Sequence, residues 1–370
     1  MNLVKTSRET LLKPLQSVSG IIERRHTLPI LSNVLLTRHG QSLTYLATDV
    51  EIEITSSINI DAAGEDKAVT VGARKLLDIL RALPEGAEVT LSVLDKRLQV
   101  KSGKSRFNLQ TLPPEDFPRM PAAEATAVRF KVEQRVLKSL FAQVQYAMAQ
   151  QDIRYYLNGL LMVVDGATLR MVATDGHRLA LATKTLEEGT ELGKLDVILP
   201  RKTILELSRL LADNDTPVEI ELTANQARFS FGDTVLVAKL IDGKFPDYNK
   251  VIPKNHPKQL DISRAQLQQA LQRVAILTND KFRGVRWVLS DGCLRISCSN
   301  TEQEEAQEEI DVEYSGEALD VGFNVTYLLD IVNNVSAESV HCALGDVNSS
   351  VVFTVKDHDD FKYVVMPMRI

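Results

Sequence analysis

The sequence has few cysteines and no long apolar run. None of its 370 residues belongs to an apolar stretch near the roughly 20 residues that a membrane-spanning helix needs. Cys293, Cys298 and Cys342 form no C-x-x-C pair and are odd in number, which argues against disulfide staples and a zinc site. The N-terminus lacks a basic region followed by an apolar one, so we expect no secretion signal. These absences predict a cytoplasmic protein with reduced thiols and no membrane partner.

Familiar catalytic motifs are also missing. There is no G-x-G-x-x-G, no H-E-x-x-H and no nucleophile elbow, and "SGKS" at 102–105 lacks the glycine that a phosphate loop needs at position 98, which is Leu98. Asp175 and His177 would suit an acid/base pair, so a phosphoester-cleaving enzyme stays open as an alternative. The preferred hypothesis is a protein without catalytic activity, cofactor or metal ion.

The chain repeats one pattern three times. "YLATD" and "MVATD" end in Asp49 and Asp175, which lie 126 residues apart, and a third copy places Asn300 another 125 residues on. Because Ala-Thr-Asp recurs where no histidine follows, we expect Asp175 to cap a turn at a strand end. Amphipathic helices flank each copy, and we expect them over 7–19, 73–83, 133–148, 200–211, 262–277 and 323–335. The predicted fold is α+β, with two-helix, multi-strand domains over 1–122, 128–253 and 258–370.

Charge is distributed unevenly along the chain. The formal net charge is −6, yet residues 257–370 alone carry 10 basic and 18 acidic side chains. The six expected helices hold 12 basic and 5 acidic residues, so the remainder of the chain is strongly negative. A shared basic helical face would bind a polyanion such as duplex DNA without reading its sequence. Two alternatives remain: lysine and arginine simply favour helices, or the protein is a sequence-specific DNA-binding regulator.

Ordered motifs along the whole chain carry a family resemblance. These are "LLKPLQSVSG", "TLPILSN", "LPEGAE", "QDIRYYLNG", "VATDGHRLA", "DGKFPDY", "KFRGVR", "GFNVTYLLD" and "YVVMPMRI". In these motifs the sequence resembles the bacterial DNA polymerase III beta subunit family, the sliding clamps. The resemblance implies a head-to-tail homodimer that closes into a six-domain ring, with helices inside, around duplex DNA. It also implies that a clamp loader places the ring and that the replicative polymerase and other proteins bind it.

The resemblance further implies a peptide-binding cleft between the second and third domains. Its residues would be Leu157, Thr174, Gly176, His177, Arg178, Leu179, Pro246, Val251, Phe282, Asn324, Tyr327, Val364, Val365, Met366, Pro367, Met368 and Arg369. Arg178 and Arg369 would stand at the rim as polar anchors. The residues alone favour a buried edge strand at the C-terminus, whereas the resemblance assigns Met366, Pro367 and Met368 to an apolar groove.

DNA contacts follow from the same resemblance. They would be Arg25, Arg74, Gln151, Tyr155 and Tyr156. Arg24 adjoins Arg25, and either could contact phosphate. Unaided, "RYY" equally suits a strand that turns Tyr155 and Tyr156 to opposite sides. Family members often have two basic residues after "FPDY", and this chain has Asn249 and Lys250, which lowers the charge at the cleft rim.

The acidic last third would meet a basic surface of the first domain in the ring. The implied dimer contacts are Lys75, Lys104, Arg106, Phe107, Leu109, Ile276, Leu277, Glu302, Glu304, Glu305 and Glu308. An acidic end that meets a basic end forms a head-to-tail interface, and such an interface can close into a ring.

Overall fold

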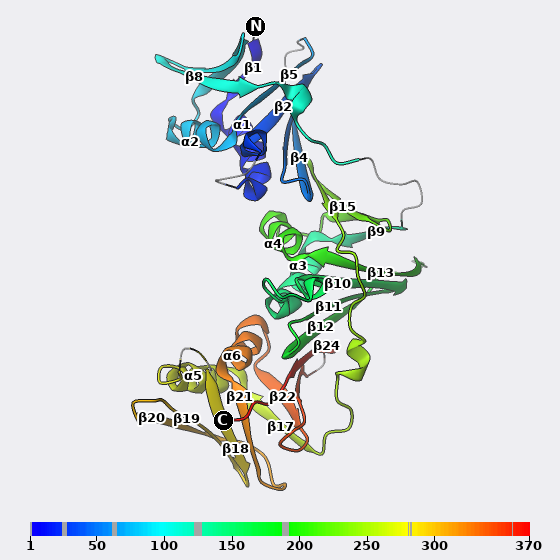
Figure 1. The fold of residues 1–370 in the computed structure, drawn as a ribbon, viewed down its shortest axis with the longest axis vertical. Coiled ribbons are helices and arrows are strands. Elements are labelled where there is room, and N and C mark those ends of the chain that lie inside the picture. The colour runs from blue at the N-terminus through cyan, green and yellow to red at the C-terminus, as the bar shows by residue number, and fades with distance from the viewer. Residues whose placement is uncertain are drawn as a thin grey trace. The chain divides into compact units, whose positions relative to one another are not determined.

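The computed structural model describes residues 2–23, 28–60, 65–121, 128–186, 192–279, 281, 283–356 and 358–370. Within these residues one order of elements occurs three times: a strand, a helix, four strands, a helix and three strands (Figure 1). Short 3-10 turns lie between some of them. The predicted triplication and the six predicted helices are therefore confirmed.

The first copy comprises β1 Asn2–Ser7, α1 Arg8–Val18, β2 Asn33–His39, β3 Ser42–Thr48, β4 Ile52–Asn59, β5 Lys67–Gly72, α2 Ala73–Ala82, β6 Glu88–Leu94, β7 Arg97–Ser102 and β8 Ser105–Leu112. The second comprises β9 Val128–Glu133, α3 Gln134–Val144, β10 Gly159–Gly166, β11 Thr168–Thr174, β12 Arg178–Thr185, β13 Leu192–Pro200, α4 Arg201–Leu210, β14 Pro217–Leu222, β15 Gln226–Phe231 and β16 Thr234–Lys239. The third comprises β17 Lys258–Ser263, α5 Arg264–Ala275, β18 Gly284–Ser290, β19 Cys293–Ser299, β20 Glu305–Asp311, β21 Leu319–Asn324, α6 Val325–Asn334, β22 Ser339–Leu344, β23 Val351–Val355 and β24 His358–Val365.

Two compact units divide the chain differently from the three copies. One contains Met1–Val136 and Leu205–Leu240, and the other contains Leu137–Ile204 and Ile241–Ile370, so the second copy contributes to both. In the first unit a twelve-stranded sheet joins β4 to β16, with Ile54 opposite Leu236. In the second unit an eight-stranded sheet joins β12 to β24, and β20, β19, β18 and β21 form a separate four-stranded sheet. Sheets thus continue from one copy into the next.

The helices bury one apolar face each against these sheets. In α6 the buried residues Val325, Leu328, Ile331 and Val332 follow the three- and four-residue spacing of a single helical face. The side chain of Ser263 accepts a hydrogen bond from the Gln266 backbone N–H, which caps the first turn of α5. Among the described residues no helix is both long and apolar enough to cross a membrane.

Candidate functional site

The element that ends in Asp49, Asp175 and Asn300 is a strand-end turn in all three copies. The Oδ1 atom of Asp175 accepts hydrogen bonds from the backbone N–H groups of His177 at 2.9 Å and Arg178 at 3.1 Å. Asp49 Oδ1 makes the equivalent pair of bonds in the first copy, at 3.0 and 2.7 Å. Asn300 Oδ1 accepts two backbone bonds at 3.0 Å in the third. The predicted capping role is confirmed, because an Asx side chain that binds N–H groups two or more residues ahead closes a turn.

The second carboxylate oxygen of Asp175 also has a partner within this turn. Its Oδ2 atom pairs with the Nε atom of Arg178 at 3.1 Å, and the His177 side chain is exposed. Both carboxylate oxygens therefore have structural partners. This favours a turn over an acid/base pair with His177.

Arg178 is the centre of a buried polar cluster. Its Nη2 atom donates to the backbone carbonyl of Tyr146 at 2.6 Å, and its Nη1 atom pairs with a carboxylate oxygen of Asp330 on α6. The same Nη1 atom lies 3.5 Å from the hydroxyl of Tyr363 on β24. With only 11% of its side chain exposed, Arg178 is not the rim anchor that we predicted. It instead connects the turn after β11 to α6 and β24.

Charge in this cluster is stabilised from several sides. Burial raises the pKa of the Asp330 carboxyl, and the neighbouring Arg178 guanidinium opposes that change. Burial on its own would lower the pKa of Arg178, but Tyr363 and Asp330 hold it above its ordinary value. The guanidinium also lies 4.4 Å from the ring centroid of Tyr327, a cation–π distance. Arg178 therefore remains a cation in an interior position.

A pocket of about 300 Å³ opens beside this turn. Its lining residues are Arg154, Tyr156, Leu157, Thr174, Gly176, His177, Arg178, Leu179, Phe245, Pro246, Tyr248, Val251, Ser350, Val364 and Met366. Leu157, Leu179 and Val364 belong to one buried apolar cluster of the second unit and form the floor. Met366 remains 45% exposed just after the end of β24. The pocket thus has a buried apolar floor and one exposed side chain, that of Met366, at its edge.

Ten of the predicted cleft residues line this pocket. They are Leu157, Thr174, Gly176, His177, Arg178, Leu179, Pro246, Val251, Val364 and Met366. Sequence reasoning missed Arg154, Phe245, Tyr248 and Ser350, and it gave Tyr156 a different role. Three of the missed residues stand inside motifs that carried the resemblance, "QDIRYYLNG" and "DGKFPDY", so proximity in sequence was the available signal.

The other predicted cleft residues do not line this pocket. Asn324 caps α6 by accepting the Thr326 N–H at 2.9 Å, and Val365 is fully buried as the last residue of β24. Tyr327 packs against Arg178, Pro367 and Met368 are half-buried, and Arg369 is exposed. Phe282 lies outside the described residues. At the C-terminus, the predicted buried strand is therefore observed up to Val365, whereas Met366 is exposed.

The loop before Leu157 closes one side of the pocket. Arg154 makes a two-pronged ion pair with Asp152, at 3.0 and 2.8 Å, and also donates to the Asp175 carbonyl at 3.1 Å. The Arg154 hydrogen bonds lower the pKa of Asp152 to about 2. Gly176 has a φ of +91°, and a Cβ there would lie 2.9 Å from an Arg154 nitrogen. Only glycine suits both the backbone conformation and this contact.

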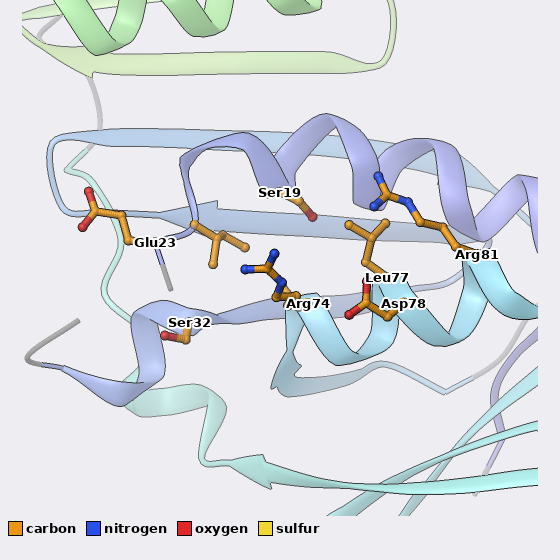
Figure 2. A pocket seen from close by; sticks show the side chains of 9 residues that line it. Ser19, Glu23, Ser32, Arg74, Leu77, Asp78 and Arg81 are labelled. Carbon is orange, nitrogen blue, oxygen red and sulfur yellow. The ribbon is translucent and has the colours of Figure 1, made fainter. Parts of the chain in front are cut away.

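The predicted DNA contacts differ in exposure. Arg74 is exposed on α2 and projects into a groove of about 400 Å³ that Glu23, Asp78 and Arg81 also line (Figure 2). Neither Arg25 nor its neighbour Arg24 lies within the described residues.

In the second unit, Gln151 has a φ of +55° and is exposed, and Tyr155 is 57% exposed. Tyr155 and Tyr156 begin a 3-10 turn rather than the strand considered above, and their ring centroids lie 5.8 Å apart. Tyr156 turns inward to the pocket, so its prediction as a DNA contact is not supported by its position.

Several basic residues of the helices have structural partners within the chain. Arg264 donates to the Ala337 carbonyl at 2.9 Å, and Arg273 forms a two-pronged ion pair with Glu308 at 2.7 and 2.6 Å. Arg8, Arg135, Arg201 and Arg209 likewise donate to carbonyls or carboxylates. The helical charge that remains available to a polyanion is therefore smaller than the sequence count suggests.

The predicted dimer contacts lie on or near two strands, β8 and β20, except for Lys75 on α2 and Ile276 and Leu277 just after α5. β8 pairs with β5 only at Thr111 and Leu112, and Arg106 and Phe107 are exposed beyond that point. Lys75 and Lys104 are also exposed, and Leu109 is half-buried. β8 therefore offers an unpaired edge with a basic and an apolar side chain.

The second strand is β20, the terminal strand of the four-stranded sheet. Around it Glu302, Glu304 and Glu305 are exposed, Ile276 is 77% exposed after α5, and Leu277 is half-buried. The Glu308 carboxylate is paired with Arg273 of the same chain, and its role as a dimer contact stays a prediction.

Comparisons with known proteins agree along the whole chain. Family models of the DNA polymerase III beta subunit match residues 1–121 as the N-terminal domain, 131–247 as the central domain and 249–369 as the C-terminal domain. The beta sliding clamps of Pseudomonas aeruginosa and Escherichia coli K12 are 48% and 46% identical over 98% of both chains. The crystal structure of the Pseudomonas aeruginosa DNA polymerase III subunit beta matches all of this chain with a TM-score of 0.96 at 47% identity. Caulobacter crescentus pol III beta matches with a TM-score of 0.92 at 38% identity. The chain therefore belongs to the DNA polymerase III beta subunit family, the bacterial sliding clamps of DNA replication.

Proposed function

We propose that the chain acts as a homodimeric ring that encircles duplex DNA in the bacterial cytoplasm and tethers the replicative polymerase to it. The observation that carries the proposal is the full-length match to beta sliding clamps, combined with a preformed pocket beside Arg178. The ring has no catalytic activity of its own in this proposal, since the Asp175 carboxylate is engaged in a turn. Domain boundaries at 1–122, 128–253 and 258–370 follow the three copies of the element order.

The pocket is proposed as a docking site for short partner peptides. Its buried floor would take apolar side chains such as leucine and phenylalanine, while exposed His177 lies at the polar edge for a glutamine. Full burial of two such side chains contributes roughly 3–6 kcal/mol before ordering costs, which by itself corresponds to a Kd on the order of tens of micromolar at best. Weak binding suits a site that the polymerase, the clamp loader and other proteins occupy in turn.

Contact with DNA is proposed to be electrostatic and independent of sequence. Arg74 on α2 is exposed, and the side chains of Lys13 and Lys138 have no ion-pair partner among the residues that the structure describes. Tyr155, exposed in its loop, offers a ring face on which a base of a single-stranded stretch next to the duplex could stack. Few fixed phosphate contacts suit sliding, because each strong contact would have to be broken at every step.

Ring closure is proposed to pair the edge of β8 in one protomer with the edge of β20 in the other. The two strands offer complementary charge, with Arg106 on the first and Glu304 and Glu305 on the second. Phe107 and Ile276 are exposed apolar side chains, and contact between the protomers would remove their surface from water. An unpaired strand edge is a natural template for a strand of another chain.

Retention on DNA tests this function directly. The protein is loaded with a clamp loader onto nicked circular DNA, washed in high salt, and the DNA is then linearised. We expect retention on the circle and release from the linear product, since a ring leaves only at an end. Retention on unblocked linear DNA would instead favour a sequence-specific DNA-binding protein, and metal-dependent phosphoester cleavage lost in His177→Ala would favour the enzyme.

A further inference from the structure

The outer face of the four-stranded sheet has a strip without side chains, formed by Gly284 on β18 and Gly322 on β21. Alternate residues of β18 and β21 are buried, so those between them face outward. Arg286 and Asp320 occupy this outer face as an ion pair, with Nε and Oδ1 2.8 Å apart. Gly322, opposite Arg286 in the register, and Gly284 on β18 leave the neighbouring area without side chains. The strip is therefore open to close approach by another backbone.

The last five residues of the chain cover this strip. After β24, the Met366 N–H donates to the His177 carbonyl at 2.9 Å. Two residues later, the Met368 N–H donates to the Gly322 carbonyl at 2.8 Å. The Ile370 side chain then lies over the glycines. The tail is thus fixed at one point to the turn beside the pocket and at another to the edge of β21.

Gly322 and Gly284 differ in how much space a Cβ atom would have. A Cβ at Gly322 would lie 2.5 Å from the Met368 carbonyl oxygen and 2.5 Å from the Ile370 Cδ1 atom. A Cβ at Gly284 would meet Ile370 Cδ1 at 3.5 Å, an ordinary contact. Neither glycine has a positive φ, so alanine is compatible with the backbone at both positions. Alanine therefore displaces the tail at one position and leaves it in place at the other.

We propose that Gly322 is a positioning residue for the peptide pocket. Its missing side chain lets residues 366–370 lie against β21, and this docking fixes Met366 at the pocket edge. A displaced Met368 moves Met366, because only Pro367 separates them. The inference rests on the proposed function of the pocket as a peptide site, and it assigns part of the affinity to a residue outside the lining.

The test compares alanine at the two glycines in the full-length protein. Binding of a fluorescein-labelled peptide with a glutamine followed by leucine and phenylalanine is measured by fluorescence anisotropy. We expect Gly322→Ala to weaken binding by roughly fivefold or more, since overpacking displaces the tail. Gly284→Ala should stay within about twofold of the original protein. Met366→Ala serves as the reference for loss of the pocket edge.

A deletion separates positioning from a general loss of structure. In a chain without residues 368–370, Gly322→Ala should no longer change peptide affinity, because no tail remains to displace. A further loss in that background would overturn the inference, and so would normal binding by full-length Gly322→Ala alongside weakened Met366→Ala. If the original protein does not bind the peptide, or if Met366→Ala binds it normally, the proposed function of the pocket fails, and the inference fails with it.

Discussion

Removal of the Arg178 side chain should lower the free energy of unfolding of the second unit more than the loss of an exposed ion pair does. Arg178→Ala deletes the partner of Asp175 and Asp330 and the donor to the Tyr146 carbonyl. Asp330 would then keep its partly buried position without a counter-charge. Burial already raises the pKa of Asp330, so the lone carboxyl would bind a proton more readily than in the original protein.

The expected magnitude follows from the burial of the pair. Breaking a buried ion pair by removing one partner costs about 3–5 kcal/mol of the free energy of unfolding. Partial protonation of Asp330 relieves some of this cost, so we expect a loss of roughly 3 kcal/mol near neutral pH. Arg178→Lys keeps the charge but lacks the planar fork that reaches several acceptors at once, and it should recover only part of the loss.

Trp287 provides the assay, because it is the only tryptophan of the chain. Its ring centroid lies 5.5 Å from that of Phe323 and 6.3 Å from that of Phe353, and Phe353 lies 6.4 Å from Tyr363. Its fluorescence in a urea titration therefore reports the unit that holds Arg178. Arg286→Ala, which breaks an exposed ion pair of the same unit, is the control and should leave the midpoint unchanged. Equal midpoints for the Arg178→Ala and Arg286→Ala proteins would refute the reasoning.

Three further predictions address other parts of the molecule. Val50 has a φ of 77° at the turn position that Gly176 fills in the second copy, so Val50→Gly should raise the thermal midpoint, and an unchanged or lower midpoint in calorimetry would contradict the strain. Ile276→Ala combined with Leu277→Ala should give monomers in analytical ultracentrifugation, since apolar contacts outlast screened charge pairs, and a persistent dimer at low concentration would remove these residues from the interface. Asp152 stabilises its loop while ionised, and because Arg154 depresses its pKa to about 2 from 3.8, this contribution is present above pH 3.8 and lost as the pH falls toward 2. A carboxyl-carbon NMR titration of Asp152 that inflects near pH 4 would contradict that shift.

Local patterns were predictable from the residues themselves, and the grouping of ten cleft residues followed from the family resemblance, but the long-range partners of Arg178 were not predicted. The turn at Asp175 followed from its recurrence, because an Asx side chain closes a turn with N–H groups only two or three residues ahead. The burial of Arg178 depends on Asp330, 152 residues away, and on Tyr363, 185 residues away. No periodicity in the sequence shows that these side chains pair with one another. Tyr156 shows the same limit, since its inward turn depends on the packing of the pocket.

The pocket combines a buried floor with an exposed edge, and that combination would let one site serve several partners, as proposed above. Leu157, Leu179 and Val364 come from a 3-10 turn and from two strands of the eight-stranded sheet, so their positions are set before any peptide arrives. A preformed floor reduces the ordering cost of binding. Met366, outside the last strand, has a flexible unbranched side chain that can fit different residues. Affinity then depends on a few apolar contacts, while exchange between partners depends on the small area that each one buries.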